Sequence, residues 1–154
     1  MDMPKPTAAH RKLERIVGHW RGEERMHPSP WSPQGGTATG HSRGRLALDG
    51  FAVIVDYEQE SGGHVTFRGH GVYTYDAQDG CYVLHWFDSM GSRPEVFRGG
   101  FEGDVLMVSR SGPEGHFRLS WQYSGTDRMT TVMETSPDGS AWSRLMDGAY
   151  AREE

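Results

Sequence analysis

The stretch FRGHGVYTYDAQDGCYVLHWFDS, residues 67–89, decides the fold. Polar and apolar residues alternate on both sides of the turn AQDG, a pattern typical of two antiparallel strands joined by a hairpin. Gly69 and Gly71 lie inside the first strand, where glycine usually marks a bend or the close approach of another group. The stretch therefore predicts a bent hairpin that is either ordinary sheet core or one wall of a pocket.

The same alternation continues along most of the chain, with short breaks that contain glycine or proline. Strands are expected at residues 19–26, 37–48, 51–60, 64–76, 81–89, 95–102, 104–110, 116–123, 128–135 and 141–152. Because most breaks are short, strands that follow one another in the sequence are expected to pair. A meander of this size leaves unpaired edges unless it closes, so we predict an all-β, up-and-down antiparallel barrel of about ten strands.

The N-terminal region differs from the rest. Thr7 is a suitable N-cap, residues 8–17 place Ala9, Leu13, Ile16 and Val17 on one helical stripe, and Gly18 ends the pattern. We expect one short helix against the outside or the end of a single domain at 7–154, preceded by a flexible tail at 1–6. The Pro-rich residues 27–36 form a long loop, which acts either as a lid or as a stiff connection whose Trp31 plugs the barrel.

Composition narrows the classes of partner. The 154 residues carry a net charge of −5 and no long basic run, which argues against nucleic acid. One cysteine, Cys81, excludes an intramolecular disulfide and a multi-cysteine metal site. The chain shows no signal-peptide pattern and no apolar run near the ~20 residues that span a bilayer. We expect a cytoplasmic protein without a membrane partner, and a homodimer is one alternative for its assembly.

Three segments resemble a known family. They are the G-x-W-x-G start (Gly18, Trp20, Gly22), the L-D-G turn at 48–50, and the W-x-D-S-M-G segment at 86–91. Over roughly residues 9–150 the chain resembles an uncharacterised bacterial domain family with a lipocalin-like (calycin-type) barrel. The resemblance implies a barrel with an internal cavity and supplies no settled activity.

The G-x-W-x-G start is also similar to nitrobindins, which are ten-stranded barrels that hold ferric haem. That resemblance implies a haem-coordinating histidine near the C-terminus. The last histidine here is His116, and residues 117–154 contain none. Haem is therefore disfavoured, and we expect no cofactor.

Candidate catalytic residues follow from a register for the strands at 51–60, 64–76 and 81–89. A two-residue turn at Gly62–Gly63 places Val55 opposite His70, and the AQDG turn places Val72 opposite His85. Tyr57, Arg68, His70 and His85 then share one face, where imidazole, phenol and guanidinium groups could perform acid–base chemistry or hold a polar ligand. A shift by one residue would redistribute these side chains. If the face is external, the same residues are ordinary surface side chains.

Other residues are candidates for ligand binding. The opposite face of the same strands carries Trp86 and Asp88, either as an aromatic wall with a buried carboxylate or as a plain strand end. Trp20, Trp31 and Trp121 are further candidate contacts. No H-x-H or H-E-x-x-H motif is present, so we expect no metal site.

Two functions remain in view. Barrels of more than eight strands are too wide for side chains alone to fill, so the leading hypothesis is binding of a small, partly apolar organic molecule. The alternative is a cofactor-free cyclase, isomerase, lyase or hydrolase that uses His70, His85, Tyr57 and Arg68. Haem binding and an interaction module without a ligand are weaker alternatives, because a fold alone does not define a function.

Overall fold

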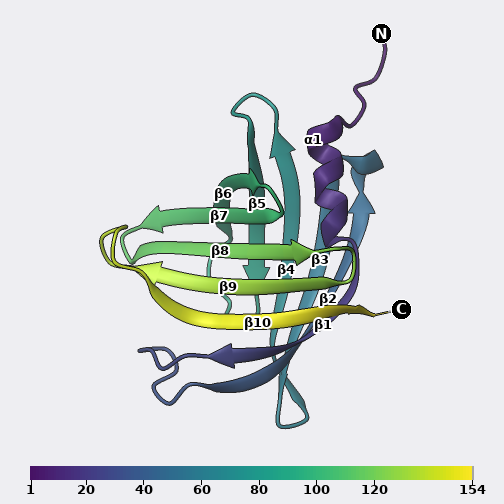
Figure 1. Cartoon of the computed structure of the whole chain (residues 1–154). Coiled ribbons are helices and arrows are strands. Elements are labelled where there is room, and N and C mark those ends of the chain that lie inside the picture. Colours follow the sequence, from purple (N-terminus) through teal and green to yellow (C-terminus); the bar gives the residue numbers. More distant parts are fainter. Residues whose placement is uncertain (154) are drawn as a thin grey trace.

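The computed structural model describes residues 1–153. It contains a closed antiparallel barrel in which each strand pairs with its sequence neighbours and β1 pairs with β10 (Figure 1). The strands are β1 (Gly18–Met26), β2 (Gly36–Ala47), β3 (Ala52–Ser61), β4 (His64–Asp76), β5 (Cys81–Asp88), β6 (Glu95–Glu102), β7 (Val105–Gly112), β8 (Gly115–Ser124), β9 (Arg128–Ser136) and β10 (Ser143–Glu153). The predicted fold class and the number of strands are confirmed.

The N-terminal helix closes one end of this barrel. It is shorter than predicted, because an α-helical turn, α1 (Ala8–Arg11), passes into the 3₁₀ helix η1 (Lys12–Ile16). Leu13 and Ile16 are buried in the barrel core. The Tyr82 hydroxyl of β5 donates to the Ala9 carbonyl at 2.6 Å, and Trp20 Nε1 of β1 donates to the Ile16 carbonyl at 3.2 Å. Inward-pointing side chains therefore bind the helix directly and seal this end.

A second 3₁₀ turn, η2 (Leu48–Gly50), corresponds to the L-D-G motif. Leu48 and Asp49 adopt positive φ angles of 51° and 55° there, a conformation that few non-glycine residues take. The turn leads to Phe51, whose ring lies 5.0 Å from that of the buried His10 of α1. This unusual backbone thus shapes the contact between the helix and the barrel.

The predicted register is correct for one hairpin and wrong for the other. Tyr75 pairs with Tyr82 and Val72 with His85, as the AQDG turn predicted. Between β3 and β4, Ser61 pairs with His64, but a bulge at Thr66 shifts the remaining pairs by one residue. Because side chains alternate between faces, this extra residue places Asp56, rather than Val55, opposite His70.

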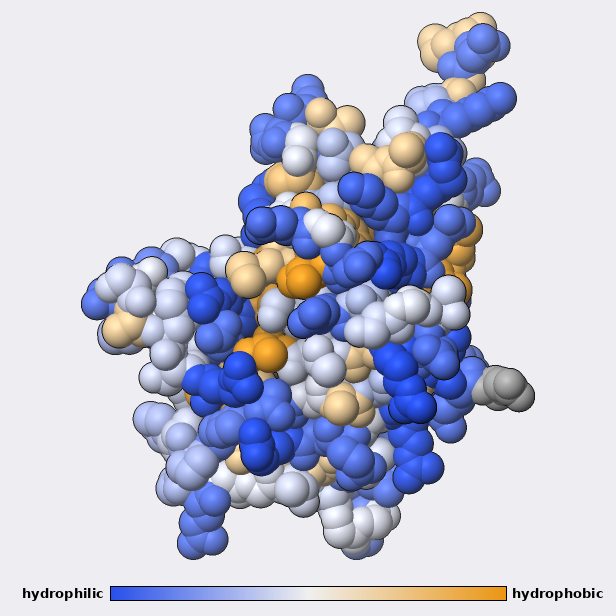
Figure 2. Space-filling view, viewed as in Figure 1, coloured by the Kyte–Doolittle hydropathy of each residue, from blue (hydrophilic) through white to orange (hydrophobic). Residues whose placement is uncertain are grey.

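The outer surface is mainly polar. Figure 2 shows that hydrophilic residues dominate the face seen in Figure 1 and that apolar residues form small, separate patches. Exposed apolar side chains such as Val96 and Met107 belong to the outer surface of the barrel. No helix among residues 1–153 is long and apolar enough to cross a membrane.

Candidate ligand cavity

The two glycines of β4 make room for an aromatic ring. A Cβ atom at Gly69 would lie 2.2 Å from the Trp86 indole, and one at Gly71 would lie 3.3 Å from the same ring. Trp86 of β5 therefore rests directly on the β4 backbone, inside the barrel. Its Nε1 donates to Asp88 Oδ2 at 2.9 Å, which fixes the ring in place. The hairpin at 67–89 is one wall of a pocket.

That pocket is a cavity of about 710 Å³ in the half of the barrel farther from the helix. Its mouth is formed by the β1–β2 loop at 27–35 and the β5–β6 loop at 89–94. Aromatic and aliphatic side chains from β3–β6 and from β8–β10 make up most of its wall. They include Tyr57, Phe67, Tyr73, Leu84, Trp86, Phe97, Phe117, Leu119, Trp121, Met129, Met133 and Met146.

A buried carboxyl group lies behind the inner part of this wall. Glu24 of β1 is 1% exposed. Its oxygens accept hydrogen bonds from Tyr57 Oη at 2.7 Å and Gln59 Nε2 at 2.9 Å, and from the Tyr150 hydroxyl. Tyr57, Gln59 and Tyr150 also line the cavity, so one layer of side chains separates it from the carboxyl group. We call Glu24, Tyr57, Gln59 and Tyr150 the Glu24 cluster.

Glycines create the space for the Glu24 cluster. A Cβ atom at Gly40 would lie 2.4 Å from Glu24 Oε2, and one at Gly148 would lie 3.4 Å from Glu24 Cγ. At Gly22, a Cβ atom would lie 2.5 Å from the Tyr150 ring. The strands that flank Glu24 therefore carry glycine where a side chain would displace the cluster.

Burial controls the ionisation of this cluster. Burial raises the pKa of the Glu24 carboxyl above its usual value near 4.5, and the hydrogen bonds from Gln59 and Tyr57 only oppose that shift. Burial and the adjacent Glu24 charge also raise the pKa of Tyr57. Tyr57 therefore stays protonated at neutral pH and acts as a hydrogen-bond donor to Glu24.

Near the mouth, an ion pair lies inside the barrel. Arg110 Nε of β7 donates to Glu95 Oε2 of β6 at 2.9 Å, and both side chains are mostly buried. The Arg110 guanidinium lies 4.6 Å from the Phe117 ring centre and 5.7 Å from that of Phe97. Asp88 lies at the end of β5 and accepts a hydrogen bond from the Met90 amide at 3.0 Å. Charge is thus concentrated at the mouth and behind the inner wall, with apolar side chains between.

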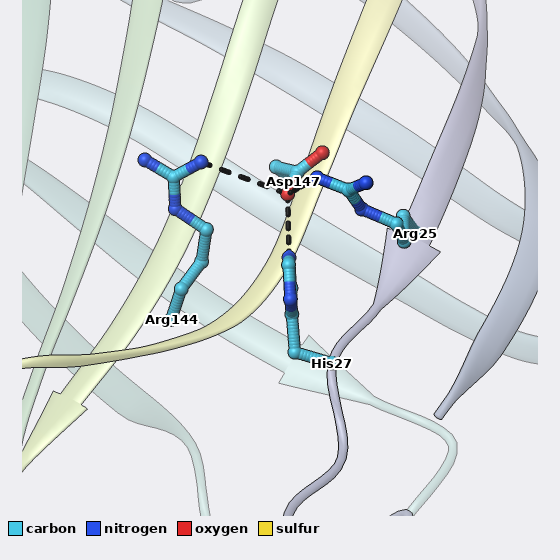
Figure 3. Close-up of polar contacts among 4 residues, drawn as sticks. All are labelled: Arg25, His27, Arg144 and Asp147. Carbon is cyan, nitrogen blue, oxygen red and sulfur yellow. Dashed lines mark hydrogen bonds and ion pairs between the residues drawn. The ribbon is translucent and has the colours of Figure 1, made fainter. Parts of the chain in front are cut away.

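Beside the mouth, three basic side chains converge on one carboxylate, as Figure 3 shows. His27 Nε2 lies 2.6 Å from Asp147 Oδ2, and Arg25 and Arg144 approach the same oxygen at 3.3 and 3.7 Å. The hydrogen bond with His27 and the Arg25 charge lower the pKa of Asp147. This network ties the start of the 27–35 loop to β10.

The predicted catalytic residues do not come together. Tyr57 faces the cavity, whereas Arg68, His70 and His85 lie on the outer face of β4 and β5. There Arg68 pairs with Glu58 at 2.5 Å, and His70 Nδ1 lies 2.7 Å from Asp56 Oδ1. The Thr66 bulge is the reason, because it rotates Tyr57 away from the face that carries the histidines.

Of the five residues predicted to contact a ligand, four line the cavity. These are Trp31, Trp86, Asp88 and Trp121. Trp31 is 67% exposed at the mouth, so it does not plug the barrel. Trp20 is 1% exposed in the sealed end, where the Arg152 guanidinium covers its ring at 4.3 Å. Trp20 is therefore a core residue.

Sequence reasoning missed Glu24, Gln59 and Arg110. Alternation could have found Glu24, because it shares the parity of Trp20 and Gly22 along β1. A charged residue at an inward position of an otherwise apolar face is an informative exception. Arg110 gave the same signal, because it shares the parity of the buried Leu106 and Val108 along β7.

Comparison with known proteins identifies the family. Residues 5–152 match the family described as a protein of unknown function, DUF1579, and the chain belongs to that family. No curated protein matches its sequence significantly.

Two solved structures share the fold. The crystal structure of Rv2717c from M. tuberculosis is similar with a TM-score of 0.72 and 14% identity, over 96% of this chain and 99% of that one. The S-type phycobiliprotein lyase CPES from Guillardia theta gives a TM-score of 0.65 and 12% identity, over 96% of this chain and 94% of that one. Both establish a common barrel architecture.

Proposed function

We propose that the chain binds a small, partly apolar organic molecule inside the barrel. The observation that carries this proposal is the cavity of about 710 Å³, sealed at one end and open at the other. Its size lies within the range of roughly 300–1,000 Å³ that is usual for small-molecule sites. A wall rich in aromatic, leucine and methionine side chains favours a ligand with a substantial apolar body.

A matched pair of variants tests this proposal. Met133 of β9 lines the cavity, and Thr130 of the same strand points outward and is exposed. The probe is 1-aminoanthracene, a neutral fluorophore whose emission rises in an apolar site. Met133→Trp narrows the cavity and should weaken probe binding by about tenfold, because the larger side chain occupies space that the probe would fill. Thr130→Trp should leave the affinity unchanged.

Failure of the wild-type protein to bind the probe would contradict the proposal, as would equal affinities for the two variants. The natural ligand is then sought by native mass spectrometry of protein purified from its own host. A mass excess that disappears on denaturation identifies the bound molecule.

A second candidate, acid–base catalysis, is favoured by the hydrogen bond between Tyr57 and Glu24. In such a reaction Glu24 accepts the phenolic proton of Tyr57 while the Tyr57 oxygen takes a proton from one atom of the substrate. Tyr57 then gives that proton to another atom of the substrate and regains its own from Glu24, so the reaction is an isomerisation that needs no co-reactant. This role replaces the one predicted for the outward-facing His70 and His85.

The ligand recovered by mass spectrometry, incubated with the protein in D₂O, tests this candidate. Wild-type protein should catalyse deuterium uptake into the ligand, and Tyr57→Phe should abolish the uptake while leaving binding intact. No uptake with the wild-type protein, or undiminished uptake with the variant, would exclude catalysis of this kind.

Haem fits this cavity poorly. His27 is the histidine that lines it, and its Nε2 already contacts Asp147 beside the mouth. Among the described residues, the cavity wall therefore offers no free imidazole near its centre for an axial ligand, and we keep haem outside the proposal.

A further inference from the structure

The charged groups in the cavity wall are unequal in number. Three carboxyl groups lie in or directly behind this wall, those of Glu24, Asp88 and Glu95, whereas Arg110 is the one guanidinium among the described residues that lines it. Arg152 also points inward but covers Trp20 at the sealed end. Arg110 is held by Glu95 at 2.9 Å. Within residues 1–153, Glu24 and Asp88 accept hydrogen bonds from neutral donors alone. A carboxyl group as deeply buried as Glu24 is costly to ionise without a cation nearby, so this interior favours the arrival of positive charge.

Aromatic rings surround the space between these carboxyl groups. Tyr57 and Trp86 lie 6.4 Å apart by ring centres, and Tyr73 and Trp121 lie 5.8 Å apart. Cations are attracted to aromatic faces within about 6 Å of a ring centre. The wall already holds one cation in this way, because Arg110 lies over Phe97 and Phe117. A second, ligand-borne cation would meet the same kind of surface deeper in the cavity.

An unpartnered hydroxyl group adds a hydrogen-bond acceptor. Thr131 Oγ1 of β9 is buried and is the one such side-chain oxygen or nitrogen without a partner among the described residues. A Cβ atom at Gly148 would lie 3.0 Å from this oxygen and 3.4 Å from Glu24 Cγ. The free hydroxyl and the buried carboxyl group therefore flank the same glycine in the cavity wall.

Basic side chains also occur near the mouth, at Arg25, His27 and Arg144. Both arginines are at least half exposed on the outer surface, and all three groups converge on Asp147. Water screens their effect on the interior more strongly than it screens the buried carboxyl groups. The inner wall therefore determines the charge preference of a ligand that enters the barrel.

We propose that the cavity takes a protonated lipophilic amine, with its ammonium group near Tyr57, Gln59 and Thr131 and its apolar body among the aromatic side chains. This proposal rests on the proposed binding function and adds the chemical class of the ligand. The ammonium group donates to the Thr131 hydroxyl oxygen and lies within reach of the Glu24 charge. The aromatic rings replace part of the water that an amine loses on burial.

Three probes of nearly equal shape test the charge preference. Naphthalene-2-methylamine is cationic at neutral pH, naphthalene-2-methanol is neutral, and naphthalene-2-carboxylate is anionic. Isothermal titration calorimetry at pH 7.5 should show the amine binding at least about tenfold more tightly than the alcohol, and the carboxylate most weakly. Equal or tighter binding of the alcohol or the carboxylate would overturn the charge inference and leave the binding function standing. No binding of any probe would overturn both.

Charge-removing variants locate the origin of the preference. Glu24→Gln should lower the affinity for the amine by about tenfold and change that for the alcohol by less than about twofold. Glu58→Gln, on the outer face of β3, is the matched control and should change neither. Should Glu24→Gln fail to fold, Asp88→Asn at the mouth replaces it and should reduce amine binding selectively. An amine affinity unaffected in the folded variants would contradict the proposal.

Discussion

The two ends of the barrel use similar residues for opposite purposes. At the sealed end, Leu13 and Ile16 of the helix enter the barrel, and Trp20 is 1% exposed. At the open end, Trp86 and Trp121 point inward in the same way but border the cavity, and Trp31 is 67% exposed. The difference arises from the helix, which fills one end and is absent from the other. Stability should therefore depend on the sealed end, and ligand binding on the open end.

Removing a matched leucine from each end gives the largest expected contrast. Leu13 is 1% exposed and packed on all sides, so Leu13→Ala should lower the free energy of unfolding by about 3 kcal/mol. Leu145 lines the cavity, where space already exists on one side, so Leu145→Ala should cost less than about 1 kcal/mol. Urea denaturation followed by circular dichroism measures both. Equal losses would show that the two ends contribute alike to stability.

The sequence predicted the strand order better than the site, and the reason is local. Turn residues and alternation determine which strands pair, so the Tyr75–Tyr82 register followed from the AQDG turn alone. The Thr66 bulge lies beyond a turn that was itself predicted correctly, and no glycine or proline marks it. One extra residue exchanged the inner and outer faces of β3 relative to β4, which moved Tyr57 into the cavity and left His70 outside.

The Glu24 cluster could not be predicted from the sequence, for a different reason. Its members come from β1, β3 and β10, and the contacts between Glu24, Tyr57 and Tyr150 exist only once the barrel has closed. In the sequence, GEERM reads equally well as an exposed charged strand. Alternation indicated a face for Glu24, but burial depended on which face became the interior.

A second prediction concerns the cost of keeping a carboxyl group next to the cavity. Because the pKa of Glu24 is raised in the folded chain, its protonated form stabilises the fold fully below the unfolded value near 4.5. That stabilisation is lost as the pH rises through the folded value. Glu24→Gln keeps a neutral side chain at every pH. The stability of the variant relative to wild type should therefore increase with pH, by at most about 1.4 kcal/mol per unit.

Urea denaturation in steps from about pH 4 to pH 8 measures this slope, with Glu58→Gln as the outward control for loss of the same charge. A stability difference between Glu24→Gln and wild type that is constant with pH would mean that Glu24 is as well solvated in the folded chain as in the unfolded one. The open half of the barrel would then impose no electrostatic cost on the fold.

The smallest expected effect on stability comes from the exposed tryptophan at the mouth. Trp31 approaches Phe117 edge-on, with ring centres 6.3 Å apart, and lies in a loop that carries little of the core. Trp31→Ala should change the free energy of unfolding by less than about 0.5 kcal/mol. The same substitution should speed ligand release by several-fold, measured by stopped-flow displacement of 1-aminoanthracene, because the ring borders the only open end among the described residues. A stability loss as large as that of Leu13→Ala would make Trp31 a packing residue and remove the distinction between the two ends. A release rate unchanged from wild type would instead place the path of the ligand along the 89–94 loop.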